Sequence, residues 1–259
     1  MTPVVVVENV SKRYMFQTYR PSLRHELGQM IARLFRRSTQ GAWEQVPFWS
    51  IRNVSFSLNA GDTLGIIGSN GAGKTTLLRL LSGISEPTEG SIHVEGRFAP
   101  LIGLGAGFDY ERTGRENIFL NAAILGIPHG EIMAALQKIV DFAELDEFLD
   151  RPVKIYSSGM IARLGFSIAY FFMPDIVFMD EIFSVGDIGF QSKSMERILE
   201  FKERQTTVVF ISHNLEAVKK LCARTIWLEH GRIKMDGPTA EVIEAYEAAK
   251  VPGHDTAAG

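Results

Sequence analysis

The sequence predicts an α/β protein with a mostly parallel sheet, an antiparallel β edge and an inserted helical subdomain. Short apolar runs rich in β-branched residues alternate with helical patterns near both ends of the chain, at residues 4–10, 51–58, 63–67, 176–179, 207–211 and 225–228. Helical patterns follow one another in the middle, at residues 116–125, 130–142 and 159–172. Because strands separated by helices form parallel sheets, residues 1–100 and 175–250 are expected to build one core. Residues 101–174 are expected to form the helical subdomain, and residues 251–259 a flexible tail.

Composition argues against several classes of protein. The chain has 259 residues, 46% of them hydrophobic and 22% charged, which suits a sizeable core and not a disordered chain. The single cysteine, Cys222, cannot form an intramolecular disulfide or a four-cysteine zinc site. The net charge of −3 gives no general reason to bind nucleic acid. Because Pro174 and Asp175 interrupt the most apolar stretch, residues 164–179, and no secretory signal begins the chain, we expect a cytoplasmic protein.

The most specific signal is the run GSNGAGKT from Gly68 to Thr75. It matches G-x-x-x-x-G-K-[ST] and lies between the predicted strand 63–67 and a helix predicted over residues 74–82, as in the core of a P-loop NTPase (RecA-like). Its glycines let backbone N–H groups point at phosphate oxygens, Lys74 reaches the β- and γ-phosphates, and the Thr75 hydroxyl binds Mg²⁺. The alternative is a glycine-rich turn that binds nothing. The candidate nucleotide-binding residues are Gly68, Ser69, Asn70, Gly71, Ala72, Gly73, Lys74, Thr75 and Thr76.

A site for Mg²⁺ and a triphosphate also needs a carboxylate at the end of a neighbouring buried strand. Asp180 and Glu181 directly follow the predicted strand 176–179. We expect Asp180 to hold the metal, mostly through water, and Glu181 to polarise the attacking water, a contribution of roughly 10²–10⁴ in rate. The alternative for the isolated pair is a strand end that meets solvent, and the phosphate loop makes the catalytic interpretation stronger.

With these motifs in this order, the sequence resembles the nucleotide-binding subunits of ATP-binding-cassette (ABC) transporters over residues 4–250. The stretch YSSGM, residues 156–160, is similar to the family signature usually written LSGGQ and lies where a helix is predicted to begin. The resemblance implies that Ser157, Ser158 and Gly159 cover the γ-phosphate of ATP held by a second copy in a homodimer. A Ser-Ser-Gly run on its own is more often a helix cap.

Three further positions match motifs of the family. Residues 184–187 resemble the D-loop, with Asp187 near the nucleotide, and His213, after the predicted strand 207–211, matches the switch histidine that contacts the γ-phosphate. Tyr14 matches the aromatic residue that stacks on adenine. The alternatives are a structural histidine at a strand end and a tyrosine that packs on the core. The family's Q-loop glutamine has no counterpart, because no glutamine lies between residues 46 and 136.

Three stretches resemble the polysaccharide-export branch of the family: the YSSGM signature, the GLGAGF run followed by TGREN, and FSVGD followed by Phe190 and Gln191. Members of that branch move lipid-linked O antigen, capsule or teichoic acid chains. The resemblance implies an ATPase that uses ATP and Mg²⁺, forms a homodimer, and binds two copies of a separate integral membrane permease. It would lie at the cytoplasmic face of the inner membrane and drive translocation of a lipid-linked polysaccharide.

The alternatives to this function are the ATPase of a teichoic acid or other exporter, a soluble ABC ATPase that acts on DNA or ribosomes without transport, and a P-loop kinase. Some members of the branch append a carbohydrate-binding domain after the cassette. Because this chain stops at residue 259, we expect a simpler exporter that does not recognise a modified chain end.

A basic segment needs its own explanation. Residues 12–37 carry seven basic side chains against Glu26: Lys12, Arg13, Arg20, Arg24, Arg33, Arg36 and Arg37. Apolar residues at helical spacing predict a basic amphipathic helix over residues 22–37, within an insertion at 15–48. One interpretation is a contact with inner-leaflet lipid or a lipid-linked pyrophosphate, since each basic residue near such a surface contributes about 1 kcal/mol. The other is a solvated helix whose apolar stripe packs on the core.

Overall fold

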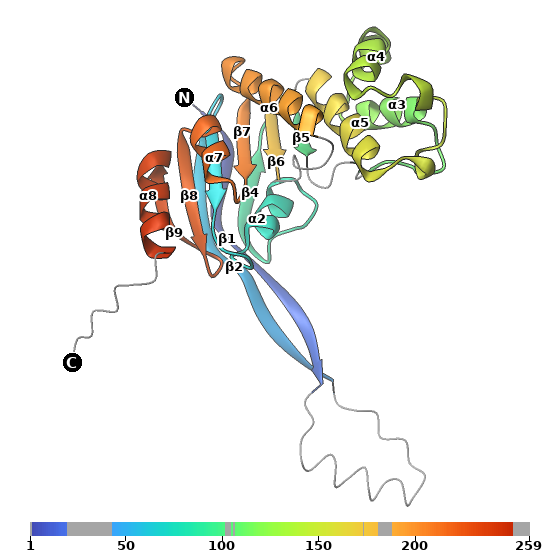
Figure 1. The fold of residues 1–259 in the computed structure, drawn as a ribbon. Coiled ribbons are helices and arrows are strands. Elements are labelled where there is room, and N and C mark those ends of the chain that lie inside the picture. Colours follow the sequence, from blue (N-terminus) through green and yellow to red (C-terminus); the bar gives the residue numbers. More distant parts are fainter. Residues whose placement is uncertain are drawn as a thin grey trace, which may run out of the picture.

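A six-stranded sheet forms the centre of the protein in the computed structural model, which describes residues 2–19, 43–101, 105, 107–172, 174–180 and 188–250 (Figure 1). The strand order is β5 (Phe98–Leu101), β6 (Ile176–Met179), β7 (Thr207–Ile211), β3 (Thr63–Ile67), β8 (Arg224–Glu229) and β9 (Arg232–Pro238). The first five of these strands run parallel, and β9 is antiparallel to β8. The predicted mostly parallel sheet is therefore confirmed.

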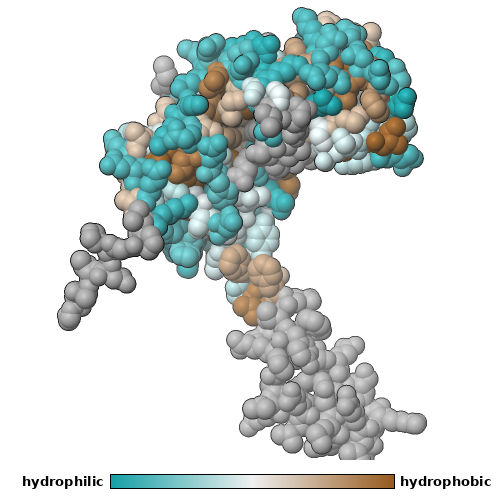
Figure 2. Space-filling view, in the orientation of Figure 1, coloured by the Kyte–Doolittle hydropathy of each residue, from teal (hydrophilic) through white to brown (hydrophobic). Residues whose placement is uncertain are grey.

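A second, antiparallel sheet has the strand order β2 (Trp43–Asn59), β1 (Pro3–Tyr19) and β4 (Glu89–Val94). The predicted antiparallel part of the fold is confirmed. It consists of this separate three-stranded sheet and of the edge strand β9 in the six-stranded sheet. β1 and β2 pair from Pro3 opposite Asn59 to Tyr19 opposite Trp43. The start of β1 and the end of β2 pack on the body of the protein. The end of β1 and the start of β2 project from it as a two-stranded ribbon (Figure 1). Met15, Phe16, Val46 and Phe48 are exposed apolar side chains of this ribbon (Figure 2).

The two ends of the insertion predicted over residues 15–48 are strands and not helix. Residues 15–19 and 43–48 belong to β1 and β2. The physical reason is cross-strand pairing: the Phe16 and Phe48 rings lie 5.6 Å apart between centroids, edge to face, and such aromatic pairs stabilise strands in a way that a local helical pattern does not reveal. The helix predicted over residues 22–37 lies outside the described residues, as does the tail at 251–259.

The two faces of the six-stranded sheet bury two different apolar clusters. Successive side chains of a strand point to opposite faces, so Ile66 and Phe178 pack with α2 (Lys74–Leu81) and the antiparallel sheet. Ile67 and Val177 instead pack in the cluster that contains side chains of α6 (Ile188–Glu203), α7 (Leu215–Leu221) and α8 (Thr239–Lys250). The parallel sheet is thus covered on both faces, as its continuous apolar runs predict.

The helical subdomain lies beside one end of the sheet (Figure 1). It consists of α3 (Gly114–Ile124), α4 (His129–Ala143) and α5 (Ser158–Phe171), with 3₁₀ turns at Asp146–Phe148 and Val153–Ile155. A third apolar cluster, which includes Ile118, Ile139 and Leu164, holds these helices together. The three predicted helices of this region are confirmed. Within the described part of the chain, none of the helices combines the length and the apolar character that a membrane crossing requires.

Candidate functional site

The predicted phosphate loop lies between β3 and α2, and its backbone has the conformation that only glycine adopts readily. Gly73 has a φ of +104°, and a Cβ atom there would lie 2.5 Å from the carbonyl oxygen of Ser50. A Cβ at Gly68 would lie 2.3 Å from the carbonyl oxygen of Leu228. Backbone atoms of β2 and β8 therefore lie against the loop and leave no room for a side chain, which explains why the motif requires glycine at its first and sixth positions.

The loop ends at an anion-binding helix terminus. Gly73 is the N-cap residue of α2, and no side chain caps the first N–H groups of this helix. These groups and the positive end of the helix dipole favour a bound phosphate. Lys74 is only 7% exposed, and its Nζ donates hydrogen bonds to the carbonyl oxygens of Gly68 at 2.8 Å and Ser69 at 3.0 Å. The ammonium group is thus held inside the loop.

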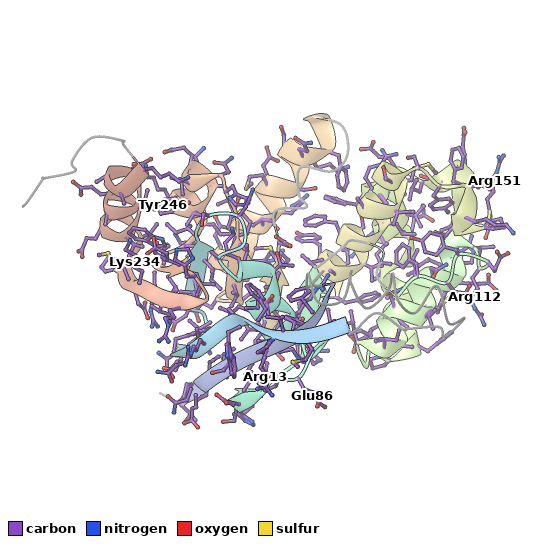
Figure 3. All side chains as sticks on the ribbon, turned by 90° about the horizontal axis from the view of Figure 1, so that it is seen from below. Arg13, Glu86, Arg112, Arg151, Lys234 and Tyr246 are labelled. Carbon is purple, nitrogen blue, oxygen red and sulfur yellow. The ribbon has the colours of Figure 1, made fainter. Side chains whose placement is uncertain are left out.

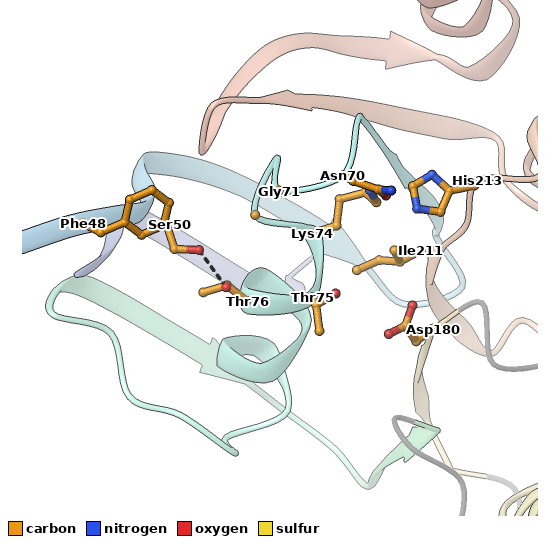
Figure 4. Close-up of a pocket in the computed structure, with 11 residues that line it drawn as sticks. Phe48, Ser50, Asn70, Gly71, Lys74, Thr75, Thr76, Asp180, Ile211 and His213 are labelled. Atoms are coloured by element: carbon orange, nitrogen blue, oxygen red, sulfur yellow. Dashed lines mark hydrogen bonds between the residues drawn. The ribbon is translucent and has the colours of Figure 1, made fainter. Parts of the chain in front are cut away.

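A cavity of about 400 Å³ opens in front of this loop (Figure 4). Its lining brings together eight of the predicted site residues, namely Asn70, Gly71, Gly73, Lys74, Thr75, Thr76, Asp180 and His213. Gly68, Ser69 and Ala72 belong to the loop without lining the cavity, and Ala72 is buried behind it. A cavity of this volume is in the range of small-molecule sites.

Asp180 and His213 reach the cavity because they follow adjacent parallel strands. β6 ends at Met179 and β7 at Ile211, and both lie on the same side of β3 in the sheet. The carboxyl ends of parallel strands form one edge of a sheet, which is where α/β proteins bind ligands. The Thr75 hydroxyl and the Asp180 carboxylate face the same space (Figure 4). A hydroxyl and a carboxylate are suitable oxygen ligands for Mg²⁺. Glu181 and Asp187 lie outside the described residues, so their roles stay predictions.

Phe48, Ser50 and Ile211 also line the cavity and were not predicted from the sequence. The Ser50 and Thr76 hydroxyl oxygens are 2.7 Å apart, which joins β2 to α2 beside the loop (Figure 4). The sequence did contain a signal for Ile211, because this residue ends a predicted strand whose carboxyl end lies at the ligand-binding edge of the sheet. Phe48 and Ser50 gave none, because their place depends on the register of β2 against β1.

The aromatic residue that lines the cavity is Phe48, and the predicted Tyr14 does not line it. Tyr14 lies directly opposite Phe48 in the antiparallel ladder, so the two side chains share one face of the ribbon. Phe48 lines the cavity and is 49% exposed, whereas Tyr14 is half-buried, with the Lys12 ammonium 5.4 Å from its ring centroid. The assignment of adenine stacking to Tyr14 stays a prediction, and Phe48 is a second candidate for the same contact.

The signature segment lies on the helical subdomain and does not line its own chain's cavity. Ser157 is the N-cap residue of α5, and its Oγ accepts a hydrogen bond from the Met160 N–H at 3.2 Å. Ser157 and Ser158 are exposed, Gly159 is half-buried, and Tyr156 is buried. The two serines are therefore accessible from solvent.

Of the stretch that replaces the Q-loop glutamine, residues 102–104 and 106 lie outside the described residues. Its end is described: Phe108 is buried in the helical subdomain.

Comparisons with known proteins agree with this geometry. A family model described as ABC transporter matches residues 51–184. RfbB of Klebsiella pneumoniae, an O-antigen export system ATP-binding protein, is 42% identical over 96% of this chain and 99% of its own length. TagH of Enterococcus faecalis, a teichoic acids export ATP-binding protein, is 43% identical over 78% of this chain and 45% of its own length.

Solved structures show the same fold at lower sequence identity. An ATP-binding subunit of an ABC transporter superposes with a TM-score of 0.71 at 21% identity, covering 96% of this chain and 95% of the other. A dimeric ATP-binding cassette in a post-hydrolysis state, bound to ADP and Pi, superposes with a TM-score of 0.69 at 18% identity, covering 91% and 98%. The phosphate loop, the carboxylate and histidine at its cavity, and these matches establish that the chain belongs to the ABC transporter family, as one of its ATPases.

Proposed function

We propose that this chain is the ATP-hydrolysing subunit of an exporter that moves a lipid-linked polysaccharide of the O-antigen type across the inner membrane. The observation that carries this proposal is the cavity in which Lys74, Thr75, Asp180 and His213 meet. The near full-length match to the O-antigen export protein RfbB supports the class of substrate.

Two copies are proposed to close head to tail around two ATP molecules. Each copy has a phosphate loop at one place and an exposed pair of serines at another, and these serines do not line the cavity of their own chain. In a head-to-tail dimer, Ser157 and Ser158 of one copy would cover the phosphate held by the other. The likeness to a dimeric cassette with bound ADP and Pi supports this arrangement.

The residues of the cavity have separate tasks. Lys74 and the N–H groups at the start of α2 bind the phosphates, and His213 contacts the γ-phosphate from the end of β7. Mg²⁺, held by Thr75 and through water by Asp180, would supply positive charge where the leaving phosphates become more negative. Glu181, next after Asp180, is proposed to accept a proton from the attacking water.

Two copies of a separate membrane permease are the proposed partners. The segment 108–118, at the start of the helical subdomain, would receive a short cytoplasmic helix of that permease. The subunit would then lie at the cytoplasmic face of the membrane without entering it. Inner-leaflet lipid is a further proposed contact, through the basic residues of the segment between β1 and β2.

The substitution Glu181→Gln tests the catalytic part of the proposal. The variant should bind ATP and accumulate as a closed dimer, with hydrolysis reduced by at least about 100-fold. Lys74→Ala is the matched control, because it should lose nucleotide binding as well as hydrolysis. Undiminished hydrolysis by Glu181→Gln would remove Glu181 from its role.

A second candidate cargo is a teichoic acid, because TagH is 43% identical over most of this chain. The test is copurification of the permease, followed by reconstitution of the complex in vesicles with either a lipid-linked O-antigen or a lipid-linked teichoic acid. Stimulation of ATP hydrolysis by the O-antigen lipid alone supports the main proposal. Stimulation by the teichoic acid lipid alone would replace it.

A further inference from the structure

We infer that the Tyr156 hydroxyl is a positioning group for the serine cap, because it fastens the residue before Ser157 to the body of the helical subdomain. This inference rests on the proposed function, in which Ser157 and Ser158 act on nucleotide held by a second copy. Tyr156 would act through the serines and would not touch the nucleotide itself.

Tyr156 is anchored at a point where the chain changes from buried to exposed. Its side chain is 7% exposed, whereas the next two residues, Ser157 and Ser158, are exposed. Its hydroxyl donates a hydrogen bond of 2.6 Å to the carbonyl oxygen of Phe148, and burial raises the pKa of the phenol. The N–H of Tyr156 donates to the carbonyl oxygen of Val153 at 2.9 Å. The residue before the cap is thus held by both its backbone and its side chain.

The first residue of α3 is shaped to admit this hydroxyl. A Cβ atom at Gly114 would lie 2.2 Å from the Tyr156 hydroxyl oxygen and 3.2 Å from Cζ of the same ring. The φ of Gly114 is not in the left-handed region, so backbone conformation gives no reason for glycine here. The close approach of the tyrosine hydroxyl is the reason that the structure offers.

Backbone hydrogen bonds join the two chain segments on either side of this anchor. Hydrogen bonds run from the N–H of Gly114 to the carbonyl oxygen of Arg151 at 3.2 Å and from the N–H of Val153 to that of Arg112 at 2.9 Å. Arg112 and Arg151 both lie on the side of the subdomain that faces away from the sheet (Figure 3). The segment 110–115, which lies within the proposed permease contact at residues 108–118, is therefore hydrogen-bonded to the segment that ends in the serine cap.

The consequence for catalysis follows from how strictly a phosphate cap must be placed. Ser157 is held as N-cap of α5, so its direction depends on where the chain enters that helix. A displacement of about 1 Å at a positioned group can cost roughly 100-fold in rate. Loss of the hydroxyl that fixes the entry of α5 should therefore weaken the phosphate cap in the dimer, and not only the stability of the subdomain.

The first test compares Tyr156→Phe with Tyr170→Phe, both in the Glu181→Gln background that accumulates the closed dimer. Each substitution removes one tyrosine hydroxyl, and with it one hydrogen bond, from the helical subdomain. The Tyr170 hydroxyl donates to the Glu200 carboxylate at 2.5 Å, away from the serine cap. Tyr156→Phe should raise the ATP concentration for half-maximal dimerisation about threefold to tenfold. Tyr170→Phe should leave it unchanged. Equal values for Tyr156→Phe and its parent would overturn the inference.

Mixed dimers separate positioning from simple loss of stability. One tagged copy carries Lys74→Ala, which disables its own phosphate loop. With Tyr156→Phe on the same copy, the altered cap faces the intact loop of the partner, and nucleotide retention at that loop should fall. With Tyr156→Phe on the other copy, the altered cap faces the disabled loop, and retention should equal that of the Lys74→Ala dimer alone. Equal retention in both placements would contradict the inference.

A double variant tests the contact directly. Gly114→Ala should weaken dimerisation as Tyr156→Phe does, and Tyr156→Phe should recover part of the loss when added to it, because it removes the atom that the new methyl group meets. Additive losses would overturn the claimed contact. If the parent itself forms no ATP-dependent dimer, the proposed function fails instead, so the two failures are distinguishable.

Discussion

Replacing Asn117 by alanine should lower the free energy of unfolding by about 2–3 kcal/mol. The Asn117 side chain is fully buried and organises the turn that precedes α3. Its Nδ2 donates to the carbonyl oxygens of Asp109 and Thr113, both at 2.9 Å, and its Oδ1 accepts from the Asp109 N–H at 2.8 Å. Without this side chain the Asp109 N–H and the Thr113 carbonyl each lose a hydrogen bond, and the Asp109 carbonyl keeps the one from the Arg112 N–H at 3.1 Å. Each loss costs about 1 kcal/mol.

Asn121 provides the control one turn further along α3. Its Nδ2 donates one hydrogen bond, to the carbonyl oxygen of Asn117 at 2.9 Å, and its side chain is half-buried. Asn121→Ala should cost less than about 1 kcal/mol. Both substitutions replace asparagine by alanine within α3 and gain the same helix propensity. The difference between their unfolding free energies therefore measures the contribution of the turn before α3.

The assay is equilibrium unfolding in urea, with amide hydrogen exchange as a local measure. The N–H of Asp109 should exchange faster in Asn117→Ala and unchanged in Asn121→Ala. Equal unfolding free energies for the two variants, with unchanged exchange at Asp109, would refute the assignment of the turn's stability to Asn117.

Three other predictions concern the cavity and the core. Gly73→Ala should abolish ATP binding measured by calorimetry. The control is Gly83→Ala, a position with a positive φ but no atom within 4 Å of its Cβ position, which should keep ATP binding and lose only about 1–2 kcal/mol of stability. Equal ATP affinities for the two variants would contradict the close approach at Gly73. Phe48→Ala should weaken ATP binding about fivefold to thirtyfold, the loss of one base stack, and Met15→Ala should not; an unchanged Kd would exclude Phe48. Burial raises the pKa of the Cys222 thiol to about 12 from 9.0. Because the unfolded chain then loses a proton that the folded chain keeps, the free energy of unfolding should fall between about pH 9 and 12, by up to about 1.4 kcal/mol per pH unit, and Cys222→Ala should lack this slope in urea titrations.

The phosphate site was predictable because its chemistry is local. From Gly68 to Thr75 the glycines, the lysine and the threonine are contiguous, so a strand and a helix on either side are enough to place them. Asp180 and His213 were predictable for a related reason: each lies within two residues of the end of an apolar run that must be a strand, and the ends of parallel strands meet at one edge.

Other parts of the site depended on contacts between distant segments. Phe48 reaches the cavity through the register of β2 against β1, and the same pairing extends the strands into both ends of the insertion expected at residues 15–48. Local apolar spacing contains no information on such a register, because a shift by one residue would turn every side chain to the other face.

Short contiguous patterns thus established the fold class, the nucleotide site and the family of this protein, since a strand, a turn and a helix obey rules that operate over a few residues. Only the folded chain decided which aromatic faces the cavity, and why Gly114 must leave room for the Tyr156 hydroxyl. Those features arise where segments far apart in sequence pack at a few ångströms, and packing of that kind is set by the whole fold and not by any one segment.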